Sequence, residues 1–295
     1  NVQVLVNAIN SLLGCYSTTI NLSAACNTRQ GDDKAMTNFI KDLNAGNIDG
    51  VLFFNSNPVY DHAMGAQIAE GLKKAKFSLS TSDRKDETTA LVNALAPDNH
   101  FLESWNDFEP VTGKMSLSQP TISNLFNCRQ AQQSFLAWSG SSESYFDFIK
   151  GRWTADRVGD AQQYWDQLLQ DGVLENETAA VAVDFAGDVA AASASLNTTG
   201  GDIELVIYET NAIGTGLQAN NPWLQETPDP ITKAVWDNYL TISPKMAKDL
   251  GLKLGDMTTQ LVSLSVGNTT VKVPALVQPG QANGTVGLAL GYGRT

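Results

Sequence analysis

The chain has 295 residues, a formal net charge of −12 and 42% hydrophobic residues. This apolar content predicts a packed core and excludes a disordered chain. A nucleic-acid-binding protein would show a basic patch, whereas the main cluster here, Lys73, Lys74 and Lys76, suits the end of a helix. No apolar run approaches the roughly 20 residues that span a bilayer. We therefore expect no nucleic acid partner and no direct membrane span.

The cysteines and histidines are few. The chain has Cys15, Cys26 and Cys128 in no C-x-x-C spacing, whereas an iron–sulphur cluster normally takes four thiolates. It has two histidines and no H-E-x-x-H, which argues against a zinc site. Cys15 and Cys26 are compatible with a disulfide or with two free thiols. We therefore expect no metal site in this chain.

The N-terminal part alternates helices with strands. Helices are predicted at 2–13, at 34–46 after an Asp32 or Asp33 cap, at 63–75 and at 86–95, and strands at 18–22, 50–54 and 77–81. The strand at 50–54, GVLFF, is a continuous apolar run, as expected of a strand covered on both faces. This alternation predicts an α/β domain with a parallel sheet.

The middle of the chain changes character twice. Residues 97–124 are long, irregular and rich in Pro, Asn and Asp, which favours a functional loop or an interface. Helical stretches follow over 125–172, and the polar, small-residue segment 175–202 resembles an insertion. A strand is predicted at 202–210. We place all of this in an α/β domain spanning residues 1–230.

The last part is rich in short strands. They are predicted at 239–243, 258–266, 269–277 and 284–290, with turns at Gly267-Asn268 and Asn283-Gly284. A single helix begins with a Ser243 cap and Pro244 and ends at Gly251. Closely spaced strands with one helix predict a small β-barrel, which we place in a second domain at 231–295.

Polar loops follow two of the predicted parallel strands. The first, 55–61, contains Asn57, Pro58 and Asp61, and the second, 82–88, contains Asp83 and Glu87. Ligands of open α/β sheets bind beside the carboxyl ends of the strands, so these side chains are candidates for contacting a ligand. The alternatives are a rigid turn at Pro58 and helix capping by the acids of the second loop.

Arg294, in the C-terminal GYGRT, is a candidate phosphate contact. Its glycines follow a strand and precede no helix, which excludes a dinucleotide-binding Rossmann fingerprint.

Several motifs together resemble a known family. The segments ISPKMAKDLGLKLGDMTTQLVSL and VKVPALVQPGQANGTVGLALGYG look like the C-terminal barrel of molybdopterin oxidoreductases, a double-psi β-barrel that covers the dinucleotide end of the cofactor. The segments NTRQGDD, NPVYD, LESWNDFEPVTGKMSLSQPTI and NNPWLQETPDPITKAVWDNYLTISP resemble one branch, the molybdopterin-oxidoreductase-like iron–sulphur subunit of bacterial alternative complex III. The resemblance covers nearly the whole chain apart from 175–202.

This resemblance implies a part of a respiratory quinol oxidoreductase at the periplasmic face of the bacterial inner membrane. The implied partners are a multihaem cytochrome c subunit and quinol-binding membrane subunits. Electrons would pass from quinol through iron–sulphur clusters, held elsewhere in a longer subunit, to haem c. The molybdopterin-like region of that branch acts as a scaffold without cofactor. We therefore expect a chain that is not catalytic by itself.

Two alternatives stay open. One is part of an active molybdopterin-dependent oxidoreductase, in which case Asn57, Pro58, Asp61, Asp83, Glu87 and Arg294 would contact molybdopterin guanine dinucleotide. The other is a periplasmic module that binds a small solute, although such proteins normally repeat a second α/β lobe where this chain predicts a barrel.

Overall fold

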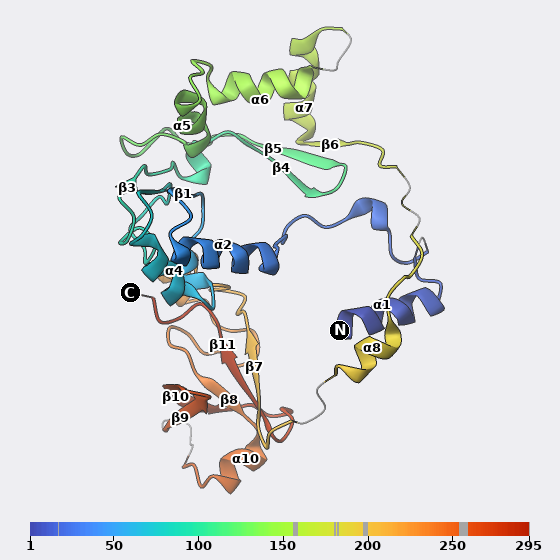
Figure 1. Ribbon diagram of the computed structural model, residues 1–295, viewed down its shortest axis with the longest axis vertical. Coiled ribbons are helices and arrows are strands. Elements are labelled where there is room, and N and C mark those ends of the chain that lie inside the picture. The colour runs from blue at the N-terminus through green and yellow to red at the C-terminus, as the bar shows by residue number, and fades with distance from the viewer. Residues whose placement is uncertain are drawn as a thin grey trace. The chain divides into compact units, whose positions relative to one another are not determined.

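The computed structural model describes residues 1–16, 18–155, 159–179, 181, 183–196, 200–253 and 259–294. The chain divides into two compact units, Asn1–Leu196 and Asn197–Thr295 (Figure 1). The predicted domain boundary between residues 230 and 231 stays a prediction. Within this structure the strand β7 (Glu204–Tyr208) pairs with a C-terminal strand, so it belongs to the second unit.

A parallel sheet forms the heart of the first unit, as the alternation of helices and strands predicts. Its strands are β1 (Gly50–Phe53), β2 (Phe77–Ser80) and β3 (Ala94–Leu95), in that order and all parallel. Helices α2 (Asp33–Ala45) and α4 (Gly65–Leu72) contribute to the same core. Its buried side chains are Ile40, Leu43, Val51, Phe53, Ile68 and Leu72.

The ends of α2 follow from local chemistry. The Asp32 carboxylate accepts a hydrogen bond from the Ala35 amide at 2.8 Å, which satisfies one of the free donors of the first turn. Gly46 ends the helix with a φ of 77°, a left-handed conformation that suits glycine. Both features match the predicted helix.

Two predicted elements of this region are wrong. Residues 86–95 form turns and then β3 instead of a helix. Pairing with β2 replaces the helix there, since the Asn93 amide donates to the Ser78 carbonyl at 3.1 Å. The predicted strand at 18–22 is also absent. The amides of Thr18, Thr19 and Ile20 all donate to the Cys15 carbonyl, which makes a tight turn.

The segment predicted to be irregular, 97–124, contains a β-hairpin. Strands β4 (Asn106–Val111) and β5 (Lys114–Ser118) are antiparallel, and β6 (Val173–Glu175) adds a third strand. Three helices confirm the predicted helical stretch, namely α5 (Ala131–Trp138), α6 (Tyr145–Thr154) and α7 (Ala161–Asp171); residues 156–158 lie outside the described ranges. Trp105 packs against Phe146 and Trp165, with ring centroids 4.9 and 6.0 Å away.

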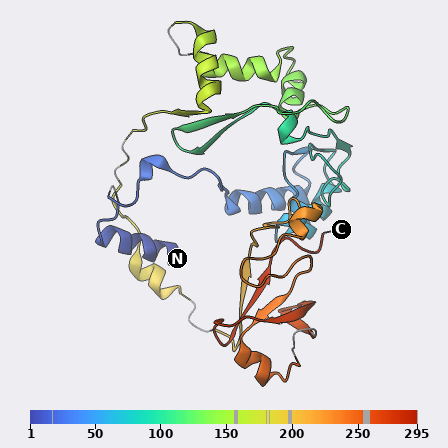
Figure 2. The same ribbon diagram turned by 180° about the vertical axis from the view of Figure 1, so that it is seen from behind.

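The insertion-like segment 175–202 contains a short helix that pairs with the N-terminal one. Helix α8 (Val189–Ala194) lies beside α1 (Val2–Leu12), as the views from both sides show (Figures 1 and 2). Residues 180, 182 and 197–199 of this segment are outside the described ranges. The short helices η1 (Leu22–Ala24), α3 (Pro58–Asp61) and η2 (Phe101–Glu103) complete the first unit.

The second unit is a mixed five-stranded sheet. Its order is β7-β11-β8-β10-β9, with β8 (Leu240–Ile242), β9 (Leu261–Val266), β10 (Thr269–Val277) and β11 (Thr285–Ala289). The pairs β7–β11 and β8–β10 are parallel, whereas β8–β11 and β9–β10 are antiparallel. The predicted strand 258–266 begins at a residue outside the described ranges. Closure of this sheet into a double-psi barrel stays a prediction.

The two helices of this unit are short. Helix α9 covers Pro222–Gln225, and α10 covers Pro244–Asp249. The Ser243 hydroxyl accepts from the Met246 amide at 3.1 Å, and Pro244 occupies the first helical position, as predicted. A separate core of Leu240, Ile242, Met246, Ala247, Ala275 and Val286 underlies the sheet.

Candidate functional site

Three loops follow the carboxyl ends of β1, β2 and β3. The sequence predicts the first two, at 55–61 and 82–88. The third, at 96–100, was missed because residues 86–95 were predicted to be a helix, which hid β3. This edge of a parallel sheet is where ligands bind in open α/β folds, so it is the candidate site.

Asn57 joins the first loop to the second. Its side chain is 5% exposed. Its amide nitrogen donates to the Glu87 carboxylate at 2.7 Å, while its carbonyl oxygen accepts from the Thr88 amide at 3.0 Å and the Thr88 hydroxyl at 2.6 Å. The Thr88 hydroxyl also accepts from the Val59 amide at 3.2 Å. The predicted residues Asn57 and Glu87 are thus brought together, and the hydrogen bond between their side chains joins the two loops.

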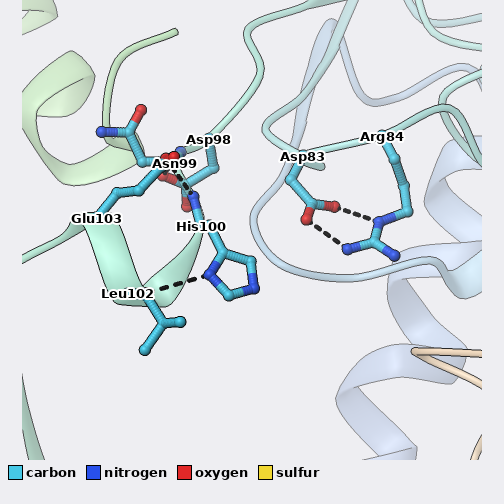
Figure 3. A network of polar contacts seen from close by, with 7 residues as sticks. All are labelled: Asp83, Arg84, Asp98, Asn99, His100, Leu102 and Glu103. Carbon is cyan, nitrogen blue, oxygen red and sulfur yellow. Dashed lines mark hydrogen bonds and ion pairs between the residues drawn. The ribbon is translucent and has the colours of Figure 1, made fainter. Parts of the chain in front are cut away.

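Asp83 pairs with its neighbour Arg84 (Figure 3). The guanidinium donates from Nε to Oδ1 at 2.7 Å and from Nη2 to Oδ2 at 2.6 Å, which is the bidentate geometry of a strong ion pair. The hydrogen bond from Arg84 lowers the pKa of Asp83 despite partial burial. Both oxygens of this candidate ligand residue are therefore already engaged.

The third loop adds a second polar group that the sequence analysis missed. One Asp98 oxygen accepts from the Asn99 and Ala131 amides, both at 2.8 Å, and burial raises the pKa of Asp98. The side-chain oxygen of Asn99, Oδ1, is buried and has no hydrogen-bond partner among the described residues.

A reciprocal cap follows directly, and Figure 3 shows it. The His100 ring accepts from the Leu102 amide at 3.3 Å, and the Glu103 carboxylate accepts from the His100 amide at 3.0 Å. The spacing of His100 and Glu103, three residues apart, is the sequence signal of a capping box. Glu103 also accepts from the Leu125 amide at 2.8 Å, which holds down the long loop.

The other predicted site residues lie elsewhere. Pro58 is the first residue of α3 and Asp61 is its last. Arg294 is in the second unit, where its guanidinium donates to the Gly216 carbonyl at 2.6 Å. All three cysteines are free thiols, which is one of the two alternatives that the sequence leaves open for Cys15 and Cys26.

Apart from the Asn99 oxygen, the polar groups described at this edge leave little hydrogen-bonding capacity for a pterin or dinucleotide. Such a ligand needs polar groups that are free to form hydrogen bonds, whereas the polar atoms of Asn57, Thr88 and Asp83 are hydrogen-bonded to other residues of the protein. Within the described ranges, no group of three or more His, Cys, Asp or Glu side chains is placed to hold a metal ion. Within the same ranges, no helix is both long and apolar enough to cross a membrane.

Comparisons with known proteins agree on the fold. The chain is 23% identical over 256 residues to a menaquinone reductase, molybdopterin-binding-like subunit, from Nitratidesulfovibrio vulgaris; the match covers 83% of the chain and 36% of that protein. Among solved structures it is similar to acetylene hydratase from Pelobacter acetylenicus, with a TM-score of 0.53, 13% identity, and coverage of 87% of the chain and 39% of that protein.

No family model matches the chain. The chain spans little more than a third of the length of either protein. Together the two similarities support a molybdopterin-oxidoreductase-like fold, in agreement with the resemblance predicted from the sequence.

Proposed function

We propose that this chain is part of the molybdopterin-oxidoreductase-like subunit of a respiratory quinone oxidoreductase complex, and that it acts there as a scaffold. The relative from Nitratidesulfovibrio vulgaris is named as part of a menaquinone reductase, and its match extends over 83% of the chain. The similarity in fold to acetylene hydratase agrees with the molybdopterin-type ancestry.

The scaffold role rests on the hydrogen bonds of Asn57. Its amide and carbonyl are both used to hold loop 82–88 against loop 55–61. Polar groups that satisfy one another rigidify a structure and leave nothing to recognise a ligand. In this proposal Asn57, Pro58, Asp61, Asp83, Glu87 and Arg294 are structural, and no molybdopterin guanine dinucleotide binds.

The finer assignment is to the iron–sulphur subunit of alternative complex III, at the periplasmic face of the inner membrane. The iron–sulphur clusters would lie in another part of the same subunit, and a multihaem cytochrome c subunit and quinol-binding membrane subunits would be the partners. The motifs NTRQGDD and LESWNDFEPVTGKMSLSQPTI support this branch. The division into an α/β domain at 1–230 and a barrel domain at 231–295 belongs to the same proposal.

Metal analysis of the natively purified complex tests the proposal. We expect iron and haem in stoichiometric amounts, no molybdenum or tungsten, and no oxidised-pterin fluorescence after denaturation. Stoichiometric molybdenum with pterin would contradict the scaffold role. Iron and haem in the same sample serve as the internal control for loss of cofactors during purification.

A substitution separates scaffolding from catalysis. In the complex, Asn57→Ala should reduce the yield of assembled enzyme while leaving quinol oxidation per haem unchanged. The matched control is Asn47→Ala, since Asn47 is exposed just before β1. A loss of turnover per assembled complex, at normal yield, would instead place Asn57 in a working site.

The second candidate is a part of an active molybdopterin-dependent oxidoreductase. The buried and unpartnered Asn99 oxygen favours it, because a ligand donor would satisfy that atom. This candidate requires the same purified complex to contain molybdenum or tungsten with extractable pterin.

A further inference from the structure

A small pocket opens in the second unit. It is lined by apolar side chains, among them Ile213 and Leu224, and by Asp229, Trp236, Tyr239 and Tyr292. Its empty volume is about 290 Å³ including the open mouth, but the part that admits the centre of a water-sized group is only about 10 Å³. The interior therefore accepts roughly one group of the size of a water molecule.

Asp229 supplies a fixed negative charge to this pocket. Its Oδ1 accepts from the amides of Ile231 at 2.9 Å and Thr232 at 2.7 Å, and from the Thr232 hydroxyl at 3.1 Å. Burial opposes ionisation, but these hydrogen bonds outweigh it and lower the pKa of Asp229. The other oxygen, Oδ2, has no hydrogen bond or ion pair among the described residues.

Aromatic side chains form another part of the lining. Tyr239 is 6% exposed, and its hydroxyl shares a 2.6 Å hydrogen bond with the Thr232 hydroxyl. The same Thr232 hydroxyl bonds to Asp229, so the phenol and the carboxylate are held in one network. Trp236 is 48% exposed at the pocket, although an indole is normally covered to a larger extent.

The backbone that carries these groups is strained. Lys233 and Trp236 have φ values of 61° and 67°, in the left-handed region that bulky residues avoid. Such conformations cost energy and persist where the surrounding structure enforces them, often at ligand-binding positions. The ammonium group of Lys233 donates to the Pro230 carbonyl at 2.8 Å. Its positive charge contributes to the lowered pKa of Asp229.

We propose that this pocket binds an ammonium group at the end of a short alkyl chain. An ionised carboxylate attracts a cation through its charge, and the indole and phenol rings of the same lining can add cation–π attraction. The narrow interior suits an ammonium head and excludes a planar guanidinium. Apolar side chains such as Leu224 would contact the alkyl stem. Two sources share this chemistry, a free alkylamine and a lysine side chain of a polypeptide.

Titration of the full chain with n-butylammonium chloride, followed by NMR of the Trp236 indole, tests the proposal. The indole signal is assigned with Trp236→Phe. We expect saturable shifts with a dissociation constant on the order of 1 mM, since so small a ligand has few contacts. Neutral n-butanol should produce no saturable shift. Equal shifts with n-butanol would overturn the proposal, because they would show an apolar site without charge recognition.

Asp229→Asn is the decisive variant. The Asn side chain keeps an oxygen for the amides of residues 231 and 232 but removes the charge, so binding should weaken at least about tenfold. Glu226→Gln is the matched control, because it makes the same charge change on an exposed residue three positions earlier. Unchanged affinity in Asp229→Asn, with native thermal unfolding, would overturn the proposal.

The two sources are distinguished by a second ligand. N-acetyl-lysine methylamide presents the same ammonium group on a peptide backbone. Tighter binding of this compound than of n-butylammonium would assign the pocket to a lysine of a partner polypeptide, and the reverse order to a free amine. Failure of both to bind would overturn the proposal, and this result is independent of the metal content of the complex.

Discussion

Asn57 and Asp83 in the strand-end loops of the first unit and Asp229 in the pocket of the second unit use their polar groups in opposite ways. At the loops, Asn57 and Asp83 have every side-chain acceptor engaged by a protein donor. In the pocket, Asp229 has one oxygen engaged and, among the described residues, one without a partner. The loops have the sequence features of a binding site, but the pocket has the unused charge. Remaining hydrogen-bonding capacity, more than polar composition, therefore indicates where a ligand could bind.

The largest expected effects test whether the two regions are independent in stability. Ile68 is 0% exposed in the core of the first unit, and Ile242 is 1% exposed in that of the second. Each change to Ala should destabilise its own unit by about 3 kcal/mol, because it removes buried methyl groups and leaves a cavity. Hydrogen exchange measured along the chain should show the loss of protection in one unit only.

A surface control accompanies both variants. Ile231 is 72% exposed, so Ile231→Ala should change stability by no more than about 0.5 kcal/mol. If Ile68→Ala lowered protection equally in both units, the two cores would have to unfold as one, and the comparison between the regions would lose its basis.

The next effect concerns the loops directly. Asn57→Ala leaves the Thr88 amide and hydroxyl and the Glu87 carboxylate without this partner, and Thr88 is fully buried. Unsatisfied buried groups should lower the free energy of unfolding by about 2 kcal/mol. Urea unfolding should show this loss, whereas Asn47→Ala should stay within about 0.5 kcal/mol of the unmodified chain. An unchanged free energy of unfolding in Asn57→Ala would contradict the proposal that Asn57 holds the two loops together.

Smaller effects depend on pH. Because Arg84 lowers the pKa of Asp83, the ionised carboxylate stabilises the folded state above the ordinary pKa of 3.8, and this contribution is lost as the pH falls through the lowered value. Asp83→Asn should therefore be less stable than the unmodified chain at neutral pH, by less than about 1 kcal/mol for so exposed a pair. The difference should shrink below pH 3.8 and in high salt. A difference that is constant with pH would exclude the ion pair as its cause.

Asp98 should behave in the opposite sense. Burial raises its pKa, so the folded state favours the protonated acid, and stability falls as the pH rises from the ordinary value of 3.8 through the raised one. Asp98→Asn removes this fall, and the expected gain at neutral pH is less than about 1 kcal/mol, since the amides of Asn99 and Ala131 keep an acceptor. Thermal unfolding of both variants across the acidic range measures the two slopes together.

Local signals in the sequence were sufficient for some elements and insufficient for others. The apolar runs at 50–54 and 77–81 and the caps at Asp32 and Ser243 predict strands and helix ends correctly, since each depends on adjacent residues. The predicted helix at 86–95 fails because its last two residues pair with β2, where Ala94 is the partner of Leu79. Pairing with another strand is a non-local contact, which periodicity does not encode.

The same reason limits prediction of the site. The sequence places two polar loops directly after β1 and β2, because their polar residues follow apolar strands. It does not reveal that Asn57 and Glu87 are bonded to each other, so they are candidate ligands until the structure shows their partners. The pocket residues Asp229, Trp236 and Tyr239 were missed as a group, because only the fold brings them to one place.

Gly65, at the start of α4, has a consequence for how sequences with this fold can diverge. A Cβ atom at this position would lie 2.1 Å from the Val59 carbonyl oxygen. Any other amino acid would push the helix away from the turn that carries Asn57. A loop side chain whose only role was to contact a ligand can change once that ligand is lost, but this glycine cannot. Among related sequences that have lost an ancestral activity, glycine at position 65 should therefore be retained more often than the residues that carried out that activity.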